Sequence, residues 1–273
     1  MAYAYPEDGA LDYQPCRYGR SRLLFRGPKR DLAGDYIAVL GGIETYGRYV
    51  PAPYPALLER ELGRLVVNLG CPNAGPDAWL GDPSVMEVVE RAAVTVVQVP
   101  AASDLTNRLY GVHPRRNDRF VKASAVLQAV YRGVDFTDFA FTRHMLRALH
   151  AAGPERFSIL AEEVQAAWLS RMGLLMERIP GRKVLLWMAD HPPRARVEAP
   201  VGEPLLVDQA MVEAVAAVTD GLVLAVPSAA ARAAGAEGMV YPAMAEPAAR
   251  GLPGVAVHAE VAGLLAGVLR GMG

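Results

Sequence analysis

The feature that most constrains the fold is a series of five short apolar runs with helical sequence between them. The runs occupy residues 36–41, 65–69, 94–100, 184–189 and 222–226. Each is bounded by Gly, Pro or Asp and is apolar at both alternating positions, which is typical of strands buried on both faces. The sequence therefore predicts a parallel sheet covered by helices.

Helical periodicity appears in the segments between the runs. Leu58 and Leu62 recur at helical spacing within 54–63, and Gly63 offers a C-cap. Further helices are predicted at 83–92, 208–219 and 261–269. The alternation of strand and helix favours a doubly wound (flavodoxin-like) α/β fold with three layers, α/β/α. We expect residues 36–273 to form this single domain.

One stretch, between the third and fourth runs, lacks strand-like patterning. Three helices are predicted there, at 119–131, 142–151 and 157–178. A crossover needs only one helix, so we expect a helical insertion at about 111–180, without the flexible linkers of a separate domain. Residues 1–35 are predicted to form an N-terminal arm, which either wraps on the domain or binds a partner.

Composition argues against several classes of partner. The 273 residues include 28 Lys plus Arg and 29 Asp plus Glu, so the net charge of −1 gives no global attraction to nucleic acid or anionic lipid. No apolar run approaches the roughly 20 residues of a membrane span, and residues 1–12 do not resemble a secretory signal. We expect a cytoplasmic protein that takes a small-molecule ligand or substrate. A homo-oligomer is left open.

No cofactor or metal is predicted. Gly41, Gly42 and Gly47 lack the third glycine and helix start of a dinucleotide loop, and no Walker-type lysine follows. The histidines are scattered, and Cys16 and Cys71 lack the paired spacing of a zinc site. Cys71 is a candidate nucleophile, with an inert buried thiol as the alternative.

The loops after the predicted strands are candidate sites, because ligands of open parallel sheets bind beyond the carboxyl ends of the strands. The first loop reads GGIETYG (41–47), and the second reads NLGCPNAGPD (68–77). The third contains Asp104 and Asn107, and His258 lies just before the last predicted helix.

These blocks resemble those of the SGNH (GDSL-type) hydrolases. That family's pattern is G-D-S-x-T-x-G, then N-L-G-x-P-G-x-G-x-D, then an Asn, then D-x-x-H at the terminal helix. The matching positions are Gly41, Thr45, Tyr46, Gly47, Asn68, Leu69, Gly70, Pro72, Gly75 and Asp77. The resemblance spans roughly 36–110 and 182–270. Segments 17–32 and 238–261 also resemble an uncharacterised bacterial family of unknown function.

The departures from the family pattern fall on its reactive positions. Ile43 stands where the family has its nucleophilic serine, and Gly42 stands where it has the preceding Asp. Asn73 replaces an oxyanion-hole glycine, and Val255 replaces the Asp of the triad. Isoleucine has no lone pair with which to attack an acyl carbon, so the Ser-His mechanism cannot operate.

Other groups could carry a changed chemistry. The resemblance makes His258 the candidate base and Asn107 or Asn73 the candidate oxyanion donors, while Glu44 is an alternative base or nucleophile at the end of a strand. Arginines can bind anionic groups through paired hydrogen bonds, and salt bridges to local acids are the alternative. The residues predicted to contact substrate are Gly42, Ile43, Thr45, Asp104, Arg115 and Arg116.

Three functions remain open at this point. The first is acyl transfer or ester hydrolysis on a small sugar- or lipid-like substrate by a non-serine mechanism. The second is an inactive relative of the hydrolases that binds a small anionic or sugar-like ligand. The third is a sulfuryl or acyl group transferase whose arginines bind the donor.

Overall fold

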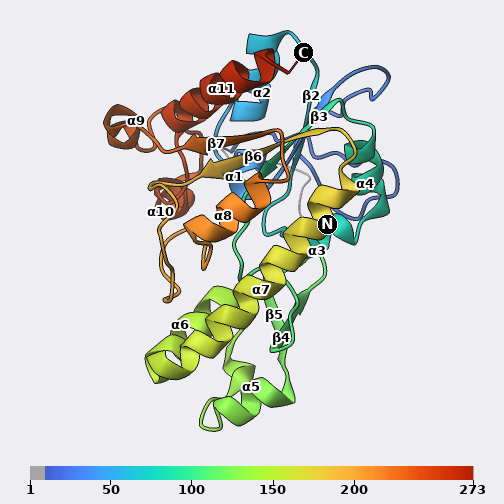
Figure 1. Ribbon diagram of the computed structural model, residues 1–273. Helices are drawn as coiled ribbons and strands as arrows, with labels where there is room; N and C mark the ends of the chain where they lie inside the picture. The colour runs from blue at the N-terminus through green and yellow to red at the C-terminus, as the bar shows by residue number, and fades with distance from the viewer. Residues whose placement is uncertain (1–9, 273) are drawn as a thin grey trace.

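The computed structural model describes residues 10–272, and its centre is a parallel sheet (Figure 1). The strands are β1 (Ile37–Gly41), β2 (Val66–Gly70), β3 (Val94–Gln98), β6 (Arg182–Met188) and β7 (Gly221–Ala225). Their order is β2-β1-β3-β6-β7, with every neighbouring pair parallel. This is the flavodoxin-like order. The five predicted strands and the doubly wound fold class are confirmed.

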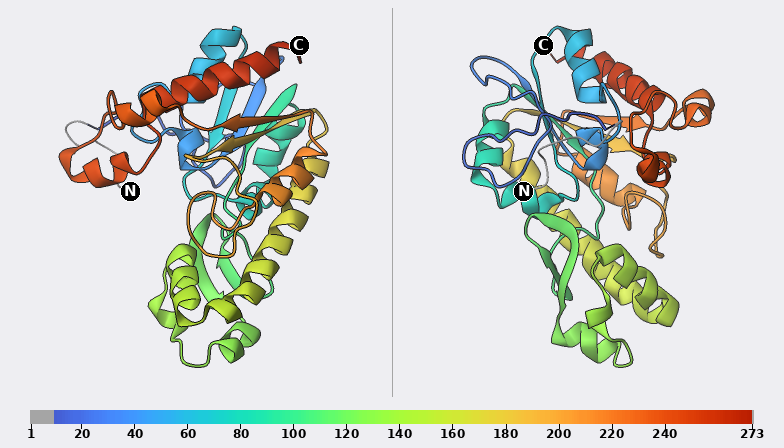
Figure 2. Two further views of the ribbon diagram at one scale, coloured as in Figure 1. Left: turned by 60° about the vertical axis from the view of Figure 1, so that its left-hand side comes forward. Right: turned by 180° about the vertical axis from the view of Figure 1, so that it is seen from behind.

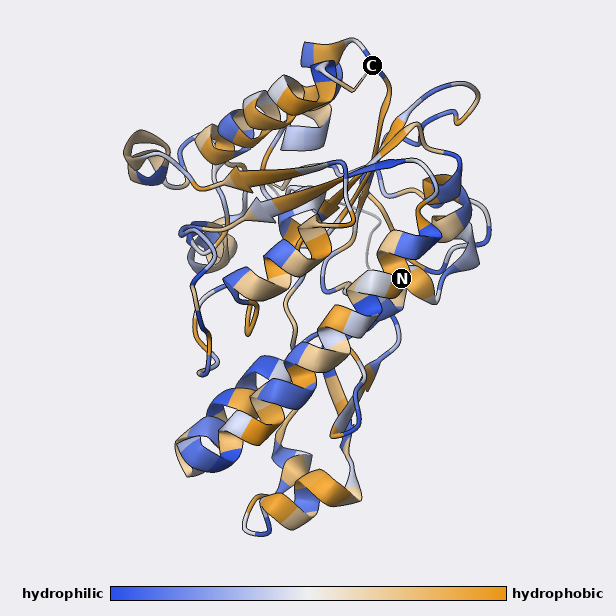
Figure 3. Cartoon of the chain, viewed as in Figure 1, coloured by the Kyte–Doolittle hydropathy of each residue, from blue (hydrophilic) through white to orange (hydrophobic). Residues whose placement is uncertain are grey.

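Alternate residues of each strand enter two separate cores. Ile37 and Val39 pack with α2 and α11, whereas Ala38 and Leu40 pack with α4, α7 and α8 on the opposite face. Figure 1 shows these two groups of helices on the two sides of the sheet, and Figure 3 shows the strands as mostly hydrophobic. The helices of the α/β/α layers and their loops are α1 (Ile43–Tyr46), α2 (Tyr54–Leu62), α3 (Pro76–Leu80), α4 (Pro83–Glu90), α8 (Gln209–Ala216), α9 (Ala229–Ala234), α10 (Glu246–Arg250) and α11 (Val255–Arg270).

The insertion projects from one end of the domain (Figure 2). It comprises an antiparallel hairpin, β4 (Tyr110–His113) and β5 (Arg116–Ala123), and three helices, α5 (Ala125–Val130), α6 (Thr142–Ala152) and α7 (Pro154–Arg178). The helix predicted at 119–131 is therefore wrong in its first half. Ser124 accepts a hydrogen bond from the Leu127 N–H and caps α5, so the helix cannot begin earlier. The residues before Ser124 pair with β4 instead.

The described part of the N-terminal arm, residues 10–35, packs on the domain. An antiparallel bridge joins Cys16 to Phe25, and the Phe25 ring is buried in the same core as α4. Arg26 Nη1 donates to the carbonyl oxygens of Gly47 at 2.6 Å and Val50 at 2.8 Å. The arm thus supports the loop that follows β1. The domain boundary at residue 35 stays a prediction.

Within residues 10–272, no single helix is both long enough and apolar enough to cross a membrane, although the bent pair Ala243–Arg250 and Val255–Arg270 reaches that length and composition together.

Gly70, at the end of β2, allows α1 to lie against the sheet. A Cβ at this position would be 2.2 Å from the backbone nitrogen of Tyr46. Because backbone cannot swing aside, Gly70→Ala should lower the free energy of unfolding by about 1–3 kcal/mol. Gly263→Ala is the matched control, since that glycine is in the exposed face of α11 with nothing within 4 Å of the added Cβ. The control should raise stability by about 0.5–1 kcal/mol in urea unfolding. Equal effects of the two substitutions would contradict the close contact.

Candidate functional site

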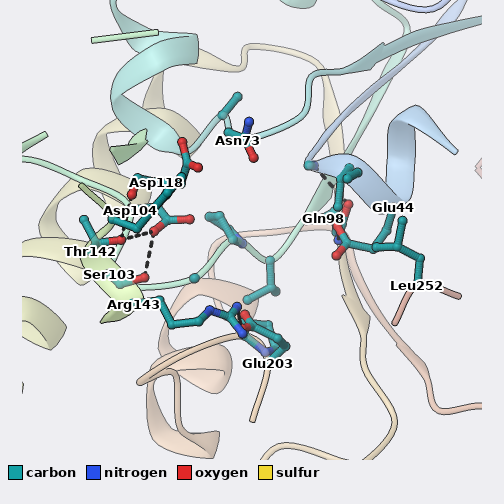
Figure 4. Close-up of a pocket in the computed structure, with 18 of the residues that line it drawn as sticks. Glu44, Asn73, Gln98, Ser103, Asp104, Asp118, Thr142, Arg143, Glu203 and Leu252 are labelled. Carbon is teal, nitrogen blue, oxygen red and sulfur yellow. Dashed lines mark hydrogen bonds and ion pairs between the residues drawn. The ribbon is translucent and has the colours of Figure 1, made fainter. Parts of the chain in front are cut away.

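A pocket of about 590 Å³ lies at the carboxyl ends of β1, β2, β3 and β6, and we call it the strand-end pocket (Figure 4). Its wall combines loops that follow the strands with the start of α6 from the insertion. The polar and charged residues that line it are Glu44, Asn73, Gln98, Ser103, Asp104, Asp118, Thr142, Arg143, His144, Arg147 and Glu203.

Glu44 is held in a fixed orientation by Gln98, the last residue of β3. Gln98 Nε2 donates to Glu44 Oε2 at 3.0 Å. Gln98 Oε1 accepts from Thr45 Oγ1 at 2.5 Å and from the Gly42 N–H at 3.2 Å. Gln98 is itself buried, with 6% of its surface exposed. The position of the Glu44 carboxylate is therefore set by the rigid sheet rather than by a loop.

Asp104 lies on the other side of the pocket from Glu44 in Figure 4. Its Oδ1 accepts hydrogen bonds from Ser103 Oγ at 2.7 Å and Thr142 Oγ1 at 3.2 Å. Burial raises the pKa of Asp104 to about 6, helped by the negative charge of Asp118 and opposed by those two hydrogen bonds. Asp104 can therefore hold or release a proton close to neutral pH.

The remaining polar groups can contact a ligand. Arg143, on α6, forms an ion pair with Glu203 from the loop after β6. Asn73 has a left-handed backbone, with φ of 65°, and its carbonyl accepts from the Asn117 N–H at 2.7 Å. Within residues 10–272, its side-chain amide makes no hydrogen bond, so it can donate to a ligand oxygen. The exposed ring of Phe141 adds an apolar surface to the wall.

Five of the predicted site residues come together in this pocket, namely Gly42, Ile43, Glu44, Asn73 and Asp104. Thr45 does not line it. Its hydroxyl is fully buried, donates to Gln98, and lies 2.7 Å from the Tyr54 hydroxyl. Thr45 thus supports the loop, and the predicted contact with substrate is corrected to an indirect role.

His258 is not part of the pocket lining, so its predicted role as base is corrected. Helix α11 begins at Val255, earlier than predicted, and this places His258 in its first turn with 1% of its surface exposed. Its Nδ1 accepts from the Tyr54 N–H at 3.1 Å, and the two rings stack with centroids 5.9 Å apart. Burial lowers the pKa of His258 to about 3. The imidazole is a neutral packing group between α2 and α11.

Asn107 is also outside the pocket lining. Its Oδ1 accepts from the N–H groups of Leu109 at 2.9 Å and Tyr110 at 3.1 Å, so the side chain closes the turn before β4. The predicted oxyanion role of Asn107 is corrected to a structural one. Cys71 is buried, and burial raises the pKa of its thiol to about 11, so it is a protonated, weak nucleophile at neutral pH.

Arg115 and Arg116 line a second cavity, which shares Asn73 with the strand-end pocket. They are therefore near the predicted site without lining it.

Several residues of the strand-end pocket were not predicted from the sequence. Gln98 left a usable signal, because it is a long polar residue at the end of a mostly apolar strand. Arg143 and Glu203 left none, because they reach the pocket from the insertion and from the long loop after β6. Within residues 10–272, no group of three or more His, Cys, Asp or Glu side chains is placed to hold a metal ion.

The raised pKa of Asp104 predicts a specific dependence of stability on pH. The folded chain keeps a proton on Asp104 up to about pH 6, whereas an unfolded Asp loses it near 3.8. The contribution of Asp104 to the free energy of unfolding is thus fully present below about pH 3.8 and is lost as the pH rises through about 6. Asp104→Asn should remove this loss, so between pH 4 and 7 the variant should gain on the order of 2–3 kcal/mol relative to the wild type.

The comparison between variant and wild type is needed because His258 acts in the opposite direction. Its lowered pKa gives stability that is present above about pH 6.5 and is lost as the pH falls toward 3. This contribution is common to both proteins and cancels in the difference. Urea unfolding at a series of pH values measures that difference, and a constant value would show that Asp104 has an ordinary pKa.

The family model described as "Domain of unknown function (DUF6473)" matches residues 1–273. The chain belongs to this family. No curated protein matches this DUF6473 chain. A solved lipase, Lip_vut3 from a goat rumen metagenome, is similar with a TM-score of 0.42 and 12% identity, over 88% of this chain and 98% of the lipase. A putative arylesterase from Agrobacterium tumefaciens is similar with a TM-score of 0.33 and 12% identity, over 88% of this chain and 100% of that one. The strand order itself shows the doubly wound fold.

Proposed function

We propose that the protein hydrolyses or transfers an acyl ester on a small sugar-like substrate, with Glu44 as the base. The observation that carries this proposal is the hydrogen bond from Gln98 to Glu44, which orients one carboxylate into the strand-end pocket. The Gln98 amide is buried and fixed by two further hydrogen bonds, so it holds the Glu44 carboxylate in one orientation. Gln98 is thus a positioning residue for Glu44.

We also propose that the fold is of the SGNH type. Two of the positions that match the family pattern are in contact across the first and second loops, since Asn68 Nδ2 donates to the Thr45 carbonyl at 2.9 Å. Within the second loop, Asn68 Oδ1 accepts from the Gly70 N–H at 2.8 Å. Ile43 lines the pocket one residue before Glu44. The proposed base is thus the neighbour of the position where the SGNH hydrolases have serine.

In the proposed reaction, the Glu44 carboxylate accepts a proton from water as the water oxygen attacks the ester carbonyl carbon. The negative charge that develops on the carbonyl oxygen is stabilised by the side-chain amide of Asn73 as donor. When the C–O bond to the sugar oxygen breaks, Glu44 returns the proton to that oxygen. The products are a carboxylic acid and a free hydroxyl group. An alcohol in place of water gives acyl transfer.

The substrate class follows from the lining of the pocket. Carboxylate oxygens of Asp118 and Glu203 and the amide of Asn73 offer several acceptors and donors for hydroxyl groups. Phe141 offers an apolar face, and the pocket has a volume suited to a small molecule. A small sugar, with hydroxyl groups around a compact ring, fits these groups.

One observation favours a second candidate, a protein that binds the same ligand without catalysis. The side chains of Ser103 and Thr142 are buried and Ile43 is apolar, so among the described residues 10–272 the strand-end pocket has no exposed Ser or Thr hydroxyl in its lining. In that case Glu44 would accept hydrogen bonds from ligand hydroxyl groups.

A panel of acetylated monosaccharides separates the two candidates. We expect saturable ester turnover by the full chain and no covalent labelling by a fluorophosphonate, because the reaction uses no serine nucleophile. Binding of the sugars without turnover of any ester would favour the second candidate. Labelling by the fluorophosphonate would contradict the Glu44 chemistry.

A further inference from the structure

We propose that a second cavity binds a phosphorylated small molecule through four arginines. This cavity, which we call the arginine pocket, has a volume of about 870 Å³. The arginines come from three segments: Arg22 from the N-terminal arm, Arg48 from the loop after α1, and Arg115 and Arg116 from the hairpin of β4 and β5. The ligand is additional to the ester of the proposed function.

The charged side chains that line the arginine pocket are all of one sign, positive. Among the described residues 10–272, no Asp or Glu lines it, and His113 lies in the same wall. Within residues 10–272, none of the four arginines has a carboxylate ion-pair partner. Like charges that surround one cavity repel each other, so their arrangement favours an anionic ligand.

Nearby acids do not neutralise the arginine pocket. Asp82 Oδ2 accepts from the backbone N–H of Arg22 and from the Ser21 hydroxyl, and its Oδ1 caps α4. Burial raises the pKa of Asp118 and the positive charge of Arg116 acts to lower it, but Asp118 lines the strand-end pocket and not the arginine pocket. Arg48 lies over the Tyr49 ring at 5.0 Å, a contact that leaves its N–H groups available in the plane of the guanidinium.

Phosphate is the anion that best suits these groups. The guanidinium group presents a planar fork of donors that matches two phosphate oxygens, and several such forks can share one phosphate or diphosphate. All four arginines are exposed, so a ligand can reach them from solvent.

The rest of the arginine pocket predicts a ligand with a ring or apolar body. Tyr13 and Tyr46 lie in its wall with ring centroids 5.2 Å apart, and Leu23 and Leu24 continue the apolar surface. Met244, which is 94% exposed, lies in the same wall. A phosphate ester can contact these side chains through its organic body, whereas inorganic phosphate cannot.

Asn73 lines both cavities, so the phosphorylated ligand would lie beside the strand-end pocket. The proposal does not rest on ester chemistry at Glu44. Glu44→Gln should bind the phosphorylated ligand as the wild type does, so failure of the proposed function and failure of this inference are distinguishable.

Isothermal titration of the full chain with inorganic pyrophosphate and with ADP, at one fixed ionic strength, tests the inference. We expect ADP to bind more tightly than pyrophosphate, because only ADP has a ring body. The double variant R115Q/R116Q should lose about tenfold or more in affinity for both, since each lost charged hydrogen bond weakens binding substantially. The matched control R17Q/R132Q removes the same charge from exposed arginines that do not line the arginine pocket, and it should change affinity by less than about twofold.

Three results would overturn the inference in whole or in part. If neither probe bound, the arginine pocket would not be a phosphate site. Equal losses in the two double variants would show general attraction to a positive surface. Equal affinities for ADP and pyrophosphate would show that the wall does not bind a ring body and that the site takes only the inorganic anion. The thermal midpoint of R115Q/R116Q should match that of the wild type, which keeps a loss of affinity from being mistaken for unfolding.

Discussion

Glu44→Gln should lower ester turnover by about 10²–10⁴-fold while the sugar product still binds, because the amide cannot accept the proton from water. The substitution changes little else. The new side-chain carbonyl can still accept from Gln98 Nε2, which now lies 3.0 Å from Glu44 Oε2, so the loop should keep its shape. Steady-state kinetics on the best acetylated sugar, together with calorimetric binding of the deacetylated sugar, measure the two effects separately.

The matched control for this prediction is Glu155→Gln. Glu155 is an exposed carboxylate at the start of α7 and does not line the strand-end pocket, so its loss changes the net charge by the same amount. We expect wild-type turnover in the control. Full activity in Glu44→Gln would exclude Glu44 as the base. Equal losses of turnover and of sugar binding would show that Glu44 acts by binding the sugar and not as the base.

The strands and fold class were predictable because their signals are local. Each run that is apolar at both alternating positions contains the information that it is buried on both faces. The strand β5 was missed for the opposite reason. Its pairing with β4 is not encoded in its own periodicity, and only the cap at Ser124 marks the point at which helix α5 begins.

The parts of the candidate site that follow strand ends were predictable from the sequence. The parts whose positions depend on how helices pack against each other were not. Glu44 and Asp104 lie in the segments that follow β1 and β3, and the topology brings the ends of these strands together. His258 was misplaced because its orientation depends on where α11 begins. Once that helix starts at Val255, the imidazole turns toward Tyr54 and not toward the pocket. Arg143 depends on how the insertion docks, which no local pattern encodes.

That docking depends on helix α7, and Trp168→Ala should therefore lower the free energy of unfolding by about 3–5 kcal/mol. Trp168 is fully buried on α7, the long helix that leads from the insertion back to the sheet. Its Nε1 donates to the Pro100 carbonyl at 3.0 Å, and Pro100 lines the strand-end pocket. Alanine would leave a large cavity and remove the donor from a part-buried carbonyl. The loss is a large share of the roughly 5–15 kcal/mol that stabilises a typical domain.

Two further variants separate the causes of this loss. Ile159→Ala lies on the same helix, but the side chain is 61% exposed, so the change should be within about 0.5 kcal/mol of the wild type. Trp168→Phe keeps most of the buried ring and loses the hydrogen bond to Pro100, so it should fall between the other two variants. Urea unfolding followed by circular dichroism measures all three. Suppose instead that the two alanine variants lost the same free energy of unfolding. The insertion would then not depend on the contact of Trp168 with Pro100. The position of Arg143 in the strand-end pocket would then be set by α6 and by the loop that carries Glu203.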